Sequence, residues 1–544
     1  MALPHLDKPA FFTEYPFVNS QLTRIASVVA MVFCLAGMTQ KSLGAITCSA
    51  GSAAVAGQAE KPAARPNILF IFADDQRSDT IHALGNDHIA TPTLDRLVQR
   101  GISFSNNHCF GSIHGAVCQP SRAMLHSGRS LYHIEMDMSN APLLGELLGS
   151  NGYQTFGTGK WHNGRDSFSR SFQAGRNIMF GGMSNHIQVP VVDLLDPAGE
   201  KGQRYSKVRK GDEFSSEIFV DSAIKFLQEE RDPTRPFFCY VAMTAPHDPR
   251  QPPEEFREKY YNQLPPLPKN FLPQHPFNNG ALVLRDEVLA GWPRQPDVIQ
   301  QQLAEYYGLI EHADQQVGRL LETLEQEGLT ENTIVVYTAD HGLAMGSHGL
   351  LGKQSLYEHS MESPLIIAGP GIGSNQRREQ LVYIHDLMPT VCQWTGVEVP
   401  EGVEGIALQP ILADPAASTR SHLFTTYTNW QRAIRDERWK MIYYPPIDRV
   451  QLFDLQTDPE EIQDRAGDAE LVEIESELKS LLQEARVAFD DPALQKKIPR
   501  GNPVVDLSKV QRKPDQWQPD WIVEKYFPAV EKDESAVEAE ETDK

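Results

Sequence analysis

The feature that most constrains the fold is a set of short apolar runs that end in polar residues. Three of these runs, with the residues that end them, are NILFIFADD (Asp74 and Asp75), RPFFCYVAMTAPHDP (His247 and Asp248) and NTIVVYTADHG (Asp340 and His341). Continuous apolar runs of this length are typical of strands buried on both faces of a parallel sheet. Because amphipathic stretches alternate with them, we predict an α/β protein with a mostly parallel central sheet flanked by helices.

The amphipathic stretches have the spacing of helices. Predicted helices are TPTLDRLVQRG (residues 91–101), APLLGELLGSNGY (141–153), the long stretch from DVIQ to EQEG (297–328) and HDLMPTVCQWTG (385–396). Gly101 and Gly328 stand at helix ends, where glycine commonly terminates a helix. These helices are expected to cover the faces of the sheet.

The pattern changes after about Thr419. Short alternating segments with turns predict antiparallel strands there, and residues 470–489 predict a helix. We therefore expect a large α/β domain over residues 60–418 and a smaller C-terminal α+β subdomain with an antiparallel sheet over residues 419–500. Residues 501–544 are expected to form an extension that is acidic and disordered at its end, where aromatic residues are lacking.

The N-terminal segment resembles a secretory signal peptide. Arg24 precedes the apolar run IASVVAMVFCLAGM, which is too short to span a bilayer, and small residues follow. Residues 1–59 are therefore predicted to be a signal peptide and linker, with cleavage near Ala56 or Ala59. A secreted or periplasmic protein with no transmembrane segment after cleavage is expected.

The overall charge excludes one class of function. The formal net charge is -22, whereas a protein that binds nucleic acid needs a basic footprint for the phosphate backbone. Most of this acidity is explained by solubility. If the substrate is an anion, cationic side chains must be concentrated locally around it.

The polar residues at the strand ends are candidate metal ligands, because ligands of open α/β sheets bind outside the carboxyl ends of the strands. The candidates are Asp74, Asp75, Asp340 and His341. One acidic pair at a strand end is usually just solvated, but carboxylates gathered from two strands repel each other unless a cation compensates. Oxygen-rich ligation favours calcium or magnesium over zinc.

Cationic and imidazole side chains occur in similar loops. They are Arg122, Lys160, His162, His247 and Lys353. Each one alone is unremarkable, since a surface lysine is usually solvated and a loop histidine often caps the backbone. Together with a hard cation they describe a pocket for a small tetrahedral oxyanion, in which a histidine can transfer protons.

Cys118 begins the segment CQPSRAMLHSGRS and has two open interpretations. The chain after residue 59 holds only Cys109, Cys118, Cys239 and Cys392, too few for a disulfide framework. Cys239 and Cys392 lie in apolar segments and are expected to be inert core thiols. Cys118 either pairs with Cys109 or carries a chemistry that explains the Pro-Ser-Arg that follows it.

The segment CQPSRAMLHSGR resembles the signature of the sulfatase family, in which this cysteine is oxidised after translation to formylglycine, an aldehyde. NILFIFADDQRSD, GYQTFGTGKWHNG, TAPHDP, the long block from TIVVYTADHG to IIAGPG, and IHDLMPT also resemble family blocks, in family order, from about Pro66 to Gly396. The resemblance implies an alkaline-phosphatase-like large domain, with the sulfatase catalytic domain over residues 60–418. It also implies maturation by the formylglycine-generating enzyme.

The resemblance carries site roles onto matching positions. The implied calcium ligands are Asp74, Asp75, Asp340 and His341, with the modified Cys118 completing the sphere of one calcium ion. The implied catalytic residues are Cys118, Arg122, which positions the formylglycine, Lys160 and Lys353, which hold sulfate oxygens, and His162 and His247, which handle protons.

The implied mechanism uses the hydrated aldehyde of residue 118. One hydroxyl attacks sulfur with Asp340 as base, and His247, helped by Lys353, protonates the leaving oxygen. The second hydroxyl then loses a proton, to His162 in our interpretation, and sulfate departs. A serine has no second hydroxyl, which explains why the chemistry needs an oxidised cysteine.

The expected substrate is a sulfate monoester on a polysaccharide or oligosaccharide, with choline sulfate or aryl sulfates as alternatives. A phosphodiesterase or phosphonate monoester hydrolase of the same superfamily is a second alternative, and a silent glycan-binding protein is a third. Asp248 and Arg250 are candidates near the leaving group. The basic stretch at residues 201–213 contacts a polyanion or is merely solvated.

Overall fold

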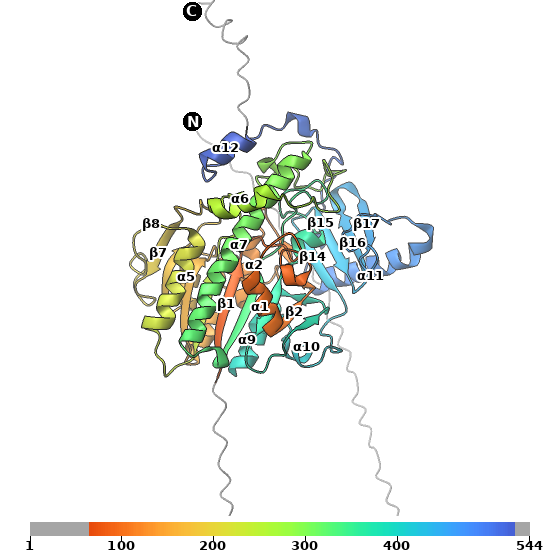
Figure 1. Cartoon of the computed structure of the whole chain (residues 1–544). Helices are drawn as coiled ribbons and strands as arrows, with labels where there is room; N and C mark the ends of the chain where they lie inside the picture. The colour runs from red at the N-terminus through yellow and green to blue at the C-terminus, as the bar shows by residue number, and fades with distance from the viewer. Residues whose placement is uncertain (1–64, 528–544) are drawn as a thin grey trace, which may run out of the picture. The chain divides into compact units, whose positions relative to one another are not determined.

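The computed structural model describes residues 65–527, and its largest element is a ten-stranded sheet (Figure 1). In spatial order its strands are β12 (Gln376–Arg378), β2 (Gly101–Phe104), β11 (Leu365–Ala368), β10 (Thr333–Ala339), β1 (Asn67–Ala73), β9 (Phe237–Ala242), β5 (Gln154–Lys160), β6 (Ala174–Met179), β7 (Pro190–Leu194) and β8 (Arg209–Lys210). Strands β10, β1, β9, β5 and β6 run parallel to one another. The predicted mostly parallel central sheet is confirmed.

Helices accompany this sheet along the described chain. They are α1 (Pro92–Arg100), α2 (Cys118–Ser127), α3 (Leu144–Ser150), α4 (Arg165–Ser171), α5 (Ser215–Lys225), α6 (Glu254–Asn262), α7 (Pro296–Gln326), α8 (Glu358–Met361), α9 (Leu387–Thr395), α10 (Gln409–Ala413), α11 (Val472–Ala488) and α12 (Asp520–Tyr526). The four helices predicted between strands correspond to α1, α3, α7 and α9, and the C-terminal one to α11. Helix α12 lies in the segment that the sequence analysis left unassigned.

Strand β1 shows how the sheet is covered on both faces. Leu69 and Ile71 belong to a core shared with α1, α5 and α7, and Figure 1 shows α5 and α7 crossing that face. Phe70 and Phe72 point to the opposite core, which includes residues of α2, α3 and α9. Because successive side chains of a strand alternate between faces, one apolar run supplies both cores. Full burial of each such side chain contributes about 1.5–3 kcal/mol.

A second sheet has five strands, four of which lie in the C-terminal part of the chain. Its strands are β17 (Arg449–Asp454), β16 (Trp439–Tyr444), β15 (Gln431–Arg435), β14 (Leu423–Tyr427) and β4 (Gly111–Ser112). The first four are antiparallel, as expected, while β4 comes from the N-terminal part and pairs parallel with β14. A third, two-stranded sheet pairs β3 (Asn107–His108) with β13 (Val382–Tyr383). The boundaries at residues 418 and 500 stay predictions.

Some expectations fall on residues outside the described range. The signal peptide and linker at residues 1–59 lie there, as does the end of the acidic extension at residues 528–544. Between residues 65 and 527, no helix combines the length and the apolar character needed to cross a bilayer.

A buried ionic cluster joins the five-stranded sheet to α8 and β3. Glu358 of α8 accepts hydrogen bonds from Arg435 of β15 at 2.5 Å and from Lys440 of β16 at 2.6 Å, and it lies 2.8 Å from His108 Nε2 of β3. Burial raises the pKa of Glu358, but Arg435 and Lys440 lower it by a larger amount, so that it lies well below its usual range. The carboxylate is therefore charged and pairs with two buried cations.

The variant Glu358→Gln tests how much this cluster stabilises the fold. Removing the charge leaves Arg435 and Lys440 buried without their shared partner, so we expect the free energy of unfolding to fall by about 3–5 kcal/mol. Equilibrium urea denaturation measures it. The matched control is Glu437→Gln on the exposed turn between β15 and β16, where no change is expected. Equal stability of the two variants would contradict the role of the cluster.

Candidate active site

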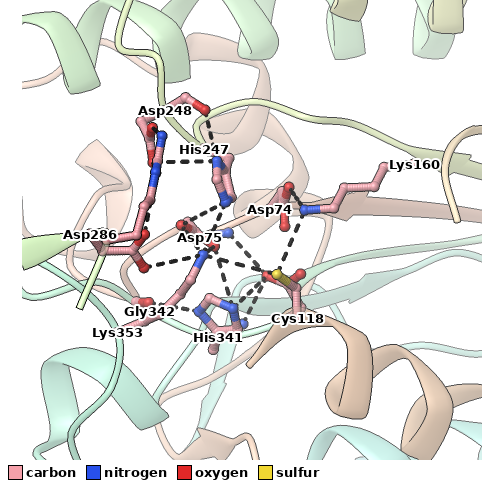
Figure 2. Close-up of polar contacts among 12 residues, drawn as sticks. Asp74, Asp75, Cys118, Lys160, His247, Asp248, Asp286, His341, Gly342 and Lys353 are labelled. Atoms are coloured by element: carbon pink, nitrogen blue, oxygen red, sulfur yellow. Dashed lines mark hydrogen bonds and ion pairs between the residues drawn. The ribbon is translucent and has the colours of Figure 1, made fainter. Parts of the chain in front are cut away.

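The carboxyl ends of four neighbouring parallel strands converge on one site (Figure 2). Asp74 and Asp75 follow β1, Asp340 and His341 follow β10, Lys160 ends β5, and His247 lies shortly after β9; all are buried. The parallel register, with Ala73 opposite Ala339, sets the two pairs side by side. The sheet thus brings together the residues that the sequence analysis chose at strand ends.

Cys118 lies at the centre of the candidate metal ligands. It is the first residue of α2 and is buried. Ligand atoms of Asp75, Cys118 and His341 lie within 4.8 Å of one another, and so do those of Asp74, Cys118 and Asp340. Three carboxylates, one imidazole and one sulfur therefore face a common space.

The orientation of His341 fits a cation in that space. Its Nδ1 donates to the carbonyl oxygen of Gly342 at 2.8 Å, so the lone pair lies on Nε2. Nε2 is buried, lacks a hydrogen-bond partner and lies 3.3 Å from Asp75 Oδ1. Burial lowers the pKa of His341, but the nearby carboxylates of Asp340 and Asp75 raise it by a larger amount, to about 9. Beside these carboxylates, Nε2 is suited to hold either a proton or a cation.

Arg122 is buried and forms hydrogen bonds to two of the carboxylates. Its Nη2 donates to Asp340 Oδ2 at 3.0 Å and to Asp74 Oδ1 at 3.3 Å, while Nη1 donates to the backbone oxygen of Lys160 at 2.7 Å. The guanidinium also lies over the ring of Phe72, at 4.9 Å from its centroid. Arg122 therefore ties three strand ends together.

Two lysines flank the Cys118 sulfur. Lys160 Nζ donates to Asp74 and lies 3.6 Å from Sγ, and Lys353 Nζ donates to both oxygens of Asp75, at 2.8 and 2.9 Å, and lies 3.9 Å from Sγ. Burial raises the pKa of the Cys118 thiol, but Lys160 and Lys353 lower it by a larger amount, so that it lies well below its usual range. An anionic group at this position is strongly favoured.

The disulfide interpretation of Cys118 is wrong. Cys118 and Cys109 are both free thiols, and burial raises the pKa of Cys109 to about 12. Cys239 and Cys392 are also free and buried, as expected of core thiols. Within residues 65–527, Cys118 is thus the thiol with two ammonium groups beside it.

The two candidate histidines flank the same sulfur. His247 Nδ1 donates to the carbonyl oxygen of Asp248 at 2.8 Å, and Nε2 lies 3.0 Å from Lys353 Nζ. His162 has a φ of 72° in the loop after β5, and burial lowers its pKa although the Cys118 sulfur raises it. A left-handed conformation at a non-glycine residue is costly and is often found at functional sites.

A cavity of about 460 Å³ opens onto these groups. Its lining includes Cys118, His162, His247 and Lys353 from the predicted set. It also includes residues that the sequence analysis missed, which are Met183, Leu284, Arg285, Asp286, Gln354 and Trp517. These residues lie in loops, where the sequence has no periodic pattern that predicts a site. Trp517 stands in the polar stretch KPDQWQPD, and a lone aromatic residue there was the signal that could have indicated a role in the cavity.

The remaining candidates lie elsewhere. Asp248 is 5% exposed and pairs with Arg285, which lines the cavity, whereas Arg250 donates to Gln302 at 2.7 Å. In the basic stretch, three of the five basic side chains pair with nearby carboxylates. The pairs are Lys201–Asp166 at 2.9 Å, Arg204–Asp166 at 3.2 Å and Arg209–Asp193 at 3.1 Å, and none of these residues lines the cavity.

Comparison with known proteins places this geometry in context. The family model described as Sulfatase matches residues 66–397, and the one described as N-sulphoglucosamine sulphohydrolase, C-terminal, matches residues 346–488. The N-acetylglucosamine-6-O-sulfatase of Bacteroides thetaiotaomicron is 28% identical, over 78% of this chain and 87% of that protein. The multifunctional alkaline phosphatase superfamily protein PehA of Trinickia caryophylli is also 28% identical, over 74% and 92%.

Among solved structures, BT4656 in complex with its substrate D-glucosamine-2-N,6-O-disulfate aligns with a TM-score of 0.67 and 25% identity. The alignment covers 79% of this chain and 100% of that one. The fold described above, with its large mostly parallel sheet and separate antiparallel sheet, is therefore shared with a protein that holds a sulfated sugar.

Calcium titration tests the ligand set. We expect isothermal titration calorimetry to detect one Ca²⁺ bound per chain, because several buried oxygens converge with a free imidazole nitrogen. Asp75→Asn should weaken binding at least about tenfold, since it removes a charged ligand.

Within residues 65–527, another group with metal-ligand spacing serves as the control; it consists of His108, Glu358 and the partly buried Glu362. Arg435 and Lys440 already pair with Glu358 there. Glu362→Gln should therefore leave calcium affinity unchanged. A loss of affinity in this variant and not in Asp75→Asn would instead place the ion at the His108 cluster and contradict the expected ligand set.

Proposed function

The chain belongs to the sulfatase family, and from that premise we propose that it removes sulfate from a sulfated carbohydrate, with Cys118 as the precursor of formylglycine. The family match covers more than half of the chain and makes it a sulfuric ester hydrolase. The observation that carries the finer proposal is the position of Cys118. It is an unpaired thiol between two lysines, 3.6 and 3.9 Å away, and beside the converging carboxylates.

We assign the calcium ion to Asp74, Asp75, Asp340 and His341. The support is the buried Nε2 of His341, which lacks a partner, together with the oxygens that converge beside it. When bound, calcium would lower the pKa of a nearby hydroxyl and polarise sulfate oxygens. Arg122 would hold Asp74 and Asp340 in place through its two hydrogen bonds.

The modified Cys118 would supply the nucleophile. A hydrated aldehyde offers one hydroxyl for attack on sulfur and a second for release of sulfate. Lys160 and Lys353 are the groups nearest to residue 118 that can neutralise sulfate oxygens. Both ammonium groups are already held by carboxylates, so they need little reorganisation when the anion enters.

His247 is suited to protonate the leaving oxygen. With Nδ1 donating to the Asp248 carbonyl, Nε2 is the nitrogen that takes up a proton, and it faces Lys353 Nζ at 3.0 Å. Proton delivery from Lys353 through His247 to the alcohol oxygen is consistent with this contact. His162, on the other side of Cys118, is the candidate base for the hydroxyl that releases sulfate.

The carbohydrate substrate is inferred from relatives. Proteins similar to this chain are named N-acetylglucosamine-6-O-sulfatase and Δ4,5-hexuronate-2-O-sulfatase, and both act on sugars. A secreted or periplasmic enzyme that meets external sulfated saccharides fits the N-terminal signal. Maturation by the formylglycine-generating enzyme is part of the proposal.

A desulfation screen tests this function directly. The matured enzyme, co-expressed with the formylglycine-generating enzyme, is incubated with defined sulfated monosaccharides and oligosaccharides, choline sulfate, and paired aryl sulfate and aryl phosphonate esters. We expect the highest kcat/KM with a sulfated saccharide. Preference for the phosphonate would instead favour the activity of a phosphonate monoester hydrolase, the alternative that the sequence leaves open.

Substitution of the nucleophile gives the sharpest prediction. Cys118→Ala should abolish turnover while leaving thermal unfolding nearly unchanged, because a shortened catalytic side chain costs little stability. Cys118→Ser should stop after one turnover, since it lacks the second hydroxyl. Cys109→Ala is the matched control and should stay active. Mass spectrometry of the peptide with residue 118 should find the aldehyde, which is lighter than the thiol; full multiple turnover by Cys118→Ser would refute the scheme.

The acid role of His247 predicts a dependence on the leaving group. A sugar alkoxide needs a proton as it departs, whereas 4-nitrophenolate departs without one. His247→Ala should therefore lower kcat by about 10²–10⁴ for a sugar sulfate, and much less for 4-nitrophenyl sulfate. Steady-state kinetics with both substrates measures the difference, and equal losses would show that His247 acts in another way.

A further inference from the structure

The C-terminal segment at residues 501–527 reaches the active-site cavity. It lies beyond both family matches, which end at residues 397 and 488. Its Trp517 lines the cavity together with Cys118, His247 and Lys353. A segment outside the family pattern therefore contributes a large aromatic side chain to the cavity mouth.

The position of Trp517 is set by polar contacts on both sides of it. Asp515 accepts from Arg285 Nε at 2.9 Å, and Gln518 donates to Asp248 Oδ2 at 3.1 Å. The backbone nitrogen of Trp517 donates to Asp515 Oδ1 at 2.8 Å, and its backbone oxygen accepts from Asn185. These bonds attach the segment to the loop that carries His247.

Helix α12 anchors the end of the segment. Tyr526 and Lys525 both donate to Glu305 of α7, at 2.5 and 3.0 Å. Arg257 of α6 lies over the ring of Trp521, at 4.9 Å from its centroid. The two tryptophans of the segment are thus distinct, since Trp521 packs against the body of the fold and Trp517 faces the cavity.

The surroundings of Trp517 indicate the chemistry of its ligand. Within residues 65–527 no aromatic ring stacks on its indole and no cation lies over it, so the half-buried ring offers an apolar surface. Arg285 pairs with three carboxylates, those of Asp248, Asp286 and Asp515, so negative charge exceeds positive charge around it and disfavours a second anion. An uncharged ring with hydroxyl groups matches both features, because the indole packs on its face and carboxylates accept from its hydroxyls.

We propose that Trp517 is a specificity-determining residue that packs against an uncharged pyranose ring carrying the scissile sulfate. The proposal rests on the proposed carbohydrate sulfatase function. The sulfate would lie among Lys160, Lys353 and residue 118, and the sugar would extend toward the cavity mouth. A second sulfate or a carboxylate on that ring would face the three carboxylates around Arg285 and bind less well.

The test compares Trp517→Ala with wild type on the monosaccharide sulfate that the desulfation screen ranks first. Loss of a stacking face should raise KM about tenfold or more, which corresponds to about 1.4 kcal/mol. The inhibition constant of inorganic sulfate, which fills only the anion site, should stay unchanged. Trp517→Phe, which keeps a ring, should remain near wild type. Trp517→Leu, which keeps apolar bulk without a ring, should raise KM as Trp517→Ala does, and it decides the question if Trp517→Ala does not fold.

The matched control is Trp521→Ala, which should lower the unfolding temperature and leave KM unchanged. Equal KM in wild type and Trp517→Ala, or the same rise in both tryptophan variants, would overturn the role of Trp517. A wild-type enzyme that hydrolyses aryl sulfate but no sugar sulfate would overturn the proposed function as well. A disulfated monosaccharide that is preferred over its monosulfated counterpart would overturn the uncharged ring.

Discussion

The structure depends on the electrostatic balance among buried carboxylates at one edge of the central sheet. Asp74, Asp75 and Asp340 would repel each other in a medium of low dielectric constant. Arg122 offsets this repulsion by donating to Asp74 and Asp340. Lys160 and Lys353 offset it further by donating to Asp74 and Asp75, respectively. The same balance lets these groups be buried and, in the proposed function, provides the site for a metal ion and an oxyanion.

That balance needs rigid support, which the rest of the fold supplies. Parallel pairing sets the ends of β1 and β10 side by side, and two apolar cores hold helices against both faces of the sheet. The cluster around Glu358 joins the second sheet to α8 and β3. The C-terminal segment then completes the cavity with Trp517. In the proposed function, the lysines that bind the anion come from the end of β5 (Lys160) and from the loop before α8 (Lys353), while the surface for the rest of the substrate comes from loops and the C-terminal segment.

The fold class and five of the twelve described helices were predictable because local pattern decides them. The periodicity of residues 297–328 identifies α7, and the apolar run before Asp74 identifies β1. The choice of strand-end residues succeeded in bringing candidates together for a general reason, since parallel strands end at one edge. The catalytic roles of these residues stay predictions, as do the domain boundaries and the signal cleavage site.

By itself the sequence determined the strands, the helices and the polar residues that end the strands, because these follow from side-chain periodicity along the chain. Only the tertiary structure decided that Cys109 and Cys118 are unpaired, that Arg250 faces Gln302, and that Trp517 lines the cavity. These outcomes depend on contacts between residues far apart in the chain. No local pattern encodes such contacts, since they arise when loops without periodicity fold over the sheet.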